Sequence, residues 1–126
     1  MKLTNQDIWA GYKGLVKLVV LDLPQKTSID LYAIIFVLER PYQAIEFFRA
    51  KLCEEYGEKD EKMGLNIVNQ DNLEKSAIFY TRLSDLFIQE WNGEFDFEPV
   101  EIDKKTAVDN MDTLAPLWGK FVKNGS

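Results

Sequence analysis

Apolar side chains recur every three or four positions near the start of the chain, a spacing typical of an amphipathic helix. The helix is expected to begin after Thr4, whose hydroxyl can cap the backbone, with Asp7 completing a capping box. Its apolar face contains Ile8, Trp9, Tyr12, Leu15, Val16 and Val19. Gly11 and Gly14 lie within this helix and would permit the close approach of a neighbouring helix.

The second helical stretch, residues 29–40, is apolar on nearly every side. This pattern predicts burial on more than one side, or an oligomer interface. Pro41 follows, and because a proline removes a helix hydrogen bond and clashes with the preceding turn, we expect a kink, or a break with the helix restarting at Tyr42. The helix is expected to end at Tyr56, with Gly57 in the left-handed cap conformation.

A short strand and a long helix are predicted next. Residues 58–64 read as a charged turn, and residues 65–69 are β-branched and bounded by turn residues, which is typical of a strand. The helix is expected to begin at Asp71, with Glu74 completing a capping box, and to end near Trp91. Its many apolar positions predict that it is well buried.

The last part of the chain is expected to form a strand over 93–104 and a helical segment capped at "TAVD" and divided by Pro116. The order of elements predicts an α+β fold, predominantly α: a helical hairpin or bundle with a small two-stranded sheet. The length of 126 residues favours one domain, which we place at residues 1–122, followed by a frayed tail at 123–126.

The segment "GEFDFEPVEIDK", residues 93–104, alternates acidic and apolar side chains and changes parity at Pro99. The side chains predicted to face the core are Phe95 and Phe97 before the proline, and Val100 and Ile102 after it. A bulge or bend at the proline would account for the change. Three interpretations of the acids stay open: they face water, they imitate the phosphates of a nucleic acid, or they hold a cation.

The chain contains no histidine, which removes the commonest general base and metal ligand. Its single cysteine, Cys53, has acidic sequence neighbours that disfavour the reactive thiolate. Carboxylate chemistry is the remaining option, with candidates Glu54, Glu55, Asp60 and Glu61 in one group and Asp96, Glu98, Glu101 and Asp103 in the other. Neither group matches a calcium-binding loop, so we expect no enzyme activity, cofactor or metal.

The net charge of −6 is concentrated between Asp85 and Asp103, a stretch with seven acids and no lysine or arginine. A basic stripe of the kind that binds nucleic acid directly is not visible. The apolar runs are shorter than the roughly 20 residues that span a bilayer, and the polar residues 1–7 lack the continuous apolar segment of a signal peptide. We therefore expect a cytoplasmic protein that binds neither nucleic acid nor membrane.

The stretches "KLTNQDIW", "LPQK" and "FFRAKLCEEYGEKDE" resemble a family of small uncharacterised proteins encoded by phages and prophages of Gram-positive bacteria. The matching positions are Leu3, Thr4, Asn5, Arg49, Leu52 and 56–61. The resemblance implies a phage accessory protein in the cytoplasm of a bacterial host, acting in virion assembly or against host defence. It implies no catalytic residues. The apolar run "LYAIIFVL" departs from the family pattern and favours a homodimer.

Two functional hypotheses follow. The first is a non-enzymatic phage accessory protein that binds a host or virion protein and forms a homo-oligomer. The alternative is an acidic inhibitor that imitates nucleic acid and occupies the channel of a host defence enzyme. The candidate partner-binding residues are Asp96, Glu98, Glu101 and Asp103.

Overall fold

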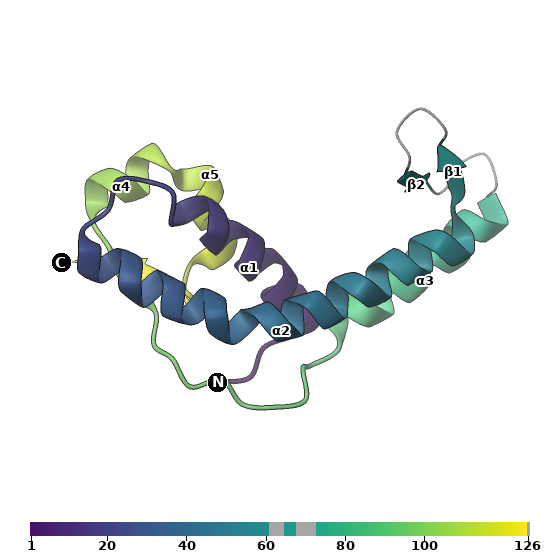
Figure 1. The fold of residues 1–126 in the computed structure, drawn as a ribbon, viewed down its shortest axis with the longest axis horizontal. Coiled ribbons are helices and arrows are strands. Elements are labelled where there is room, and N and C mark those ends of the chain that lie inside the picture. The colour runs from purple at the N-terminus through teal and green to yellow at the C-terminus, as the bar shows by residue number, and fades with distance from the viewer. Residues whose placement is uncertain (61–64, 68–72, 126) are drawn as a thin grey trace.

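The fold is predominantly helical with short strands, which confirms the predicted α+β class. The computed structural model describes residues 1–60, 65–67 and 73–125. Its elements in chain order are α1 (Asn5–Leu18), α2 (Gln25–Tyr56), β1 (Glu58–Asp60), β2 (Leu65–Ile67), α3 (Leu73–Ile88), β3 (Val100–Ile102), α4 (Lys104–Asp109), α5 (Met111–Leu114), the 3-10 helix η1 (Ala115–Leu117) and β4 (Val122–Asn124). Figure 1 shows α2 running the length of the molecule, with the other elements along it.

Helix α1 begins as its sequence predicts. The hydroxyl of Thr4 accepts from the backbone N–H of Asp7, and the Asp7 carboxylate accepts from the backbone N–H of Thr4, at 3.1 and 3.0 Å. The close approach predicted at the two glycines is also found, although the neighbours belong to the C-terminal elements. Leu117 lies against Gly14, and the ring of Phe121 lies against Gly11.

An extended N-terminal arm precedes α1 and pairs with the chain that follows α3. The backbone N–H groups of Phe95 and Trp91 donate to the carbonyls of Met1 and Leu3, at 3.0 and 2.8 Å. The N–H of Asn5 completes the row with a bond of 2.8 Å to the carbonyl at position 89. This pairing was not predicted. It holds the start of the acidic segment, residues 93–104, beside the N-terminal arm.

Helix α2 runs unbroken from Gln25 to Tyr56, so the predicted alternative of a break at Pro41 is wrong. Its N-terminal half packs on β3, α1 crosses it near its middle, and its C-terminal half packs on α3 (Figure 1). Gly57 ends the helix as predicted, but its φ of −100° is extended and not left-handed. One side of the apolar run is buried, and the opposite side is exposed.

Strand β2 confirms the strand predicted after position 64, and it pairs antiparallel with β1, where a charged turn was expected. The predicted helix start at Asp71 lies outside the described residues. Helix α3 ends at Ile88 and not near Trp91, because the following residues pair with the N-terminal arm. The prediction that α3 is well buried is wrong: Leu73 and Ile88 are 78% and 70% exposed.

The C-terminal elements form a parallel pair of strands that the sequence did not predict. β3 pairs with β4 in the register Val100↔Val122 to Ile102↔Asn124, and α4, α5 and η1 connect the two strands. The two predicted strands therefore have separate partners and do not pair with each other. The tail expected to be frayed at 123–126 instead contributes Lys123 and Asn124 to β4.

The hydrophobic core lies between α1, the N-terminal half of α2 and the C-terminal elements. Its fully buried side chains are Leu3, Ile8, Leu15, Leu18, Leu31, Leu38, Ile102, Leu114, Leu117, Phe121 and Val122. The ring of Phe97 stacks on that of Phe121 at a centroid distance of 5.8 Å, which connects the acidic segment to this core.

Candidate partner-binding site

The acidic segment keeps the alternation that its sequence predicts, although only residues 100–102 form a strand. Phe95 is buried and Phe97 half-buried, whereas the acids between and beside them are exposed. After Pro99 the buried positions are Val100 and Ile102. The predicted change of parity at the proline is therefore present, within an extended segment that enters a short strand.

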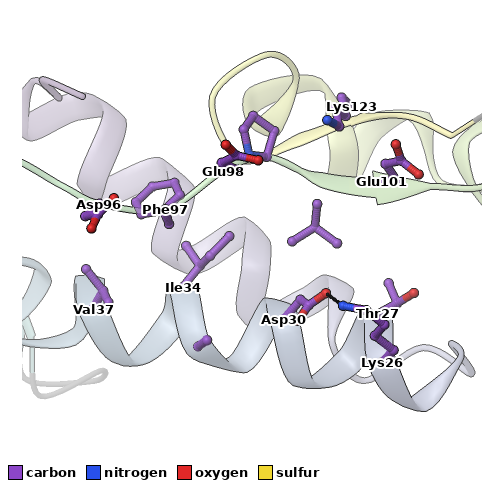
Figure 2. Close-up of a pocket in the computed structure, with 13 residues that line it drawn as sticks. Lys26, Thr27, Asp30, Ile34, Val37, Asp96, Phe97, Glu98, Glu101 and Lys123 are labelled. Atoms are coloured by element: carbon purple, nitrogen blue, oxygen red, sulfur yellow. Dashed lines mark hydrogen bonds and ion pairs between the residues drawn. The ribbon is translucent and has the colours of Figure 1, made fainter.

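A groove lies between the N-terminal half of α2 and residues 96–101, with a volume of about 610 Å³ (Figure 2). The apolar residues lining it are Ala33, Ile34 and Val37 from α2 and Phe97, Pro99 and Val100 from the opposite wall. The charged and polar residues lining it are Lys26, Thr27, Asp30, Asp96, Glu98, Glu101 and Lys123. We call this hollow the α2–β3 groove.

The groove brings together three of the four predicted partner-binding acids: Asp96, Glu98 and Glu101. All three are exposed, and none forms an ion pair with a residue in the described part of the chain. Asp30, on the opposite wall, pairs with Lys26 at 2.9 Å. Four acids and two lysines leave the lining with a charge of −2.

Asp103, the fourth predicted acid, has a structural role. Its carboxylate accepts from the hydroxyl and the backbone N–H of Thr106, at 2.6 and 3.1 Å, and so caps α4. These hydrogen bonds, that of the hydroxyl first, lower the pKa of Asp103 below its ordinary value. The cap predicted at Thr106 is therefore supplied three residues earlier. Asp103 also lines a smaller hollow of about 210 Å³, beside Glu101 and Thr27.

A second surface runs along the solvent side of α2. It consists of Ile29, Tyr32, Phe36 and Phe47, which we call the outer face of α2. Phe36 is 68% exposed and Phe47 77% exposed, and the rings of Tyr32 and Phe36 lie 6.2 Å apart. Beside Phe47 is a hollow of about 390 Å³, lined also by Tyr42, Gln43, Glu46 and Ala50.

A polar cluster joins α1 to the middle of α2. Glu46 accepts from the Trp9 indole N–H at 2.8 Å and from two nitrogens of Arg49 at 2.9 and 2.5 Å. The Arg49 hydrogen bond is the main cause that lowers the pKa of Glu46, against the effect of burial. Arg49 also donates to the sulfur of Cys53 at 3.6 Å, and Lys13 lies over the Trp9 ring. The Trp9–Glu46 hydrogen bond links α1 to α2, and Arg49 neutralises the Glu46 carboxylate.

The other acids proposed for carboxylate chemistry do not form a site in the described residues. Glu54 and Glu55 are exposed near the end of α2, and Glu61 lies outside the described part of the chain. No group of three or more acidic or cysteine side chains there is arranged to hold a metal ion. Within the same residues, no helix has both the length and the apolar character needed to cross a membrane.

Comparisons with protein-family models, curated proteins and solved structures found no match for the chain. What the protein binds therefore has to be inferred from its own surface.

Proposed function

We propose that the chain is a non-enzymatic phage accessory protein that acts by binding proteins through the outer face of α2, first of all a second copy of itself. The observation that supports this proposal is the exposure of Phe36 and Phe47, two large apolar side chains on one side of a single helix. Large exposed apolar side chains gathered on one surface mark interaction sites, and on α2 the exposed polar residues Glu39, Arg40 and Gln43 separate Phe36 from Phe47. Burying each phenylalanine would contribute about 1.5–3 kcal/mol.

A second copy fits this face because it carries both a projection and a recess. Phe36 projects from α2, and the hollow beside Phe47 lies about three turns further along the helix. When two copies cross about a two-fold axis, Phe36 of each one meets the hollow of the other, so both contacts form together. Such a self-complementary contact is the usual geometry of a homodimer.

The phage context rests on the resemblance of three sequence stretches, which favours a role in the cytoplasm of a bacterial host with a host or virion protein as partner. The alternative, an acidic inhibitor that imitates nucleic acid, is supported by the exposure of Asp96, Glu98 and Glu101. Their location supports it less well, because these acids line a hollow. A phosphate mimic has to project into the groove of its partner.

Light scattering on size-exclusion fractions tests the proposal with the variant Phe36→Lys. We expect the dimer dissociation constant to rise about a hundredfold or more, since both copies carry the substitution and the two lost contacts together are worth about 3–6 kcal/mol. Val108→Lys is the matched control, because Val108 is also a helical position, 60% exposed, outside the outer face of α2. Equal dissociation constants for the two variants would refute the assignment of the interface.

A further inference from the structure

The α2–β3 groove is lined by a different side of α2 from the outer face. Ala33, Ile34 and Val37 contribute to the groove, whereas Ile29 and Phe36 do not. The two surfaces adjoin on α2, because Ala33 comes four residues after Ile29 and three before Phe36.

The groove has the length of a short extended peptide. Its lining on α2 runs from Lys26 to Val37, which at 1.5 Å per residue is roughly 16 Å. An extended chain rises about 3.3 Å per residue, so about five residues would span it. The volume of about 610 Å³ lies within the range of established binding pockets.

The floor and the rim of the groove differ in chemistry. The apolar part of the lining includes the buried side chains of Ile34 and Val100, and Figure 2 shows Phe97 over the α2 wall. The rim carries Glu98, Glu101 and the other acids that lack a cationic partner among the described residues. A segment that alternates apolar and basic side chains matches this division, because successive side chains of an extended chain point to opposite sides.

The backbone of β3 offers a further contact. β3 pairs with β4 on one edge and also packs on α2. The N–H of Val100 donates to the carbonyl of Phe121, and the carbonyl of Ile102 accepts from the N–H of Gly125. These two partners flank β4. In a parallel pair the residue between Val100 and Ile102, Glu101, directs its N–H and carbonyl to the opposite edge. An extended segment in the groove would meet this edge in the manner of an added strand.

We infer that the α2–β3 groove binds an extended segment of a partner protein in which lysine or arginine alternates with apolar residues. The inference rests on the proposed function in taking the chain to be a binding protein, but it does not depend on the homodimer. The charge attraction between the acidic rim and a basic segment also accounts for the concentration of acids in this part of the sequence.

Fluorescence anisotropy with a short labelled peptide of alternating lysine and valine tests the inference. Two control peptides are a grouped one, with the same composition but all lysines before all valines, and an alternating peptide of glutamate and valine. We expect the lysine–valine alternating peptide to bind best and the glutamate peptide not to bind. Equal binding of the grouped peptide would refute a groove-specific mode, because charge alone would then explain the affinity.

Ala33→Trp fills the groove without changing its charge, and we expect it to weaken binding of the alternating peptide by about tenfold or more. The matched control is Ala44→Trp, at an exposed position of α2 outside the groove lining, which should bind as the unmodified protein does. Unchanged binding by Ala33→Trp would overturn the inference. Thermal unfolding of both variants shows that the fold is retained.

The masses of the same samples by light scattering separate the two proposals. A dimer that fails to bind the alternating peptide would refute the groove inference and leave the proposed function standing. A monomer that binds the peptide, with binding lost in Ala33→Trp, would refute self-association through α2 and support the groove.

Discussion

Gly11 of α1 lies directly against the ring of Phe121, so that a Cβ atom added to this glycine would approach Cε2 of the ring to 2.5 Å. The ring is 1% exposed and stacks on Phe97. Three parts of the chain, α1, the acidic segment and the residue before β4, therefore meet at this contact. A glycine in α1 allows the C-terminal chain to come close enough to complete the core.

Gly11→Ala is expected to destabilise the protein by about 1–3 kcal/mol, because the buried ring would have to move. Helix propensity alone predicts that Gly11→Ala stabilises the protein, since alanine is favoured over glycine in a helix by about 1 kcal/mol. Gly14→Ala is a matched control with a smaller expected loss, because its Cβ would meet the end of the flexible Leu117 side chain at 2.9 Å. Urea unfolding measures both, and a Gly11→Ala protein more stable than the parent would contradict this packing.

Asn5 is expected to tolerate substitution poorly, because it joins the start of α1 to the end of α3. Its side chain is 7% exposed, and its amide nitrogen donates to the Leu86 carbonyl at 2.8 Å. Asn5→Asp would replace the amide donor by a carboxylate that faces the Leu86 carbonyl at the C-terminal, negative end of α3. We expect the free energy of unfolding to fall by about 2 kcal/mol or more.

Asn5→Ala removes the same hydrogen bond without adding a charge, so we expect it to lose less stability than Asn5→Asp. The comparison is made by thermal unfolding at neutral pH. If the two variants have the same melting temperature, the added charge at the end of α3 does not contribute to the loss of stability.

Stability is expected to fall in acid because several carboxylates, Glu46 and Asp7 among them, have lowered pKa values in the folded protein. The Arg49 hydrogen bond lowers the pKa of Glu46 below its ordinary 4.5. At Asp7 burial acts to raise the pKa, but hydrogen bonds from Lys120 and Thr4 together bring it below 3.8. A lowered folded-state pKa contributes stability above the unfolded value, and this contribution is lost as pH falls through the folded one.

The free energy of unfolding should therefore be nearly level above about pH 5 and decrease below about pH 4.5. Glu46→Gln should flatten part of this decrease, whereas Glu39→Gln, at an exposed position of the same helix, should leave the profile unchanged. Urea unfolding across this pH range makes the comparison. An unaltered profile for Glu46→Gln would show that the Glu46–Arg49 pair contributes nothing to the pH dependence.

Local signals in the sequence predicted the features that depend on neighbouring residues. The capping box of Thr4 and Asp7 and the end of α2 at Gly57 are examples. The pairing of the N-terminal arm with residues 89–95, and of β3 with β4, could not be predicted in this way. These pairs form between backbone groups far apart in the chain, and the partner segments, the N-terminal arm and β4, are too short to show an alternating pattern.

The candidate site was predictable only in part. Alternation about Pro99 located Asp96, Glu98 and Glu101, but the opposite wall of their groove comes from α2, about 60 residues or more earlier. Asp103 could have been set apart, because Asp followed three positions later by Thr106 is a local capping pattern. The apolar run of α2 indicated a helix with much apolar surface, but not which side its own fold would cover.

Sedimentation equilibrium of the unmodified protein at micromolar concentration tests most directly the claim that α2 binds a second copy. We expect a species of twice 14.6 kDa that dissociates on dilution. A single species of 14.6 kDa at every concentration would contradict it.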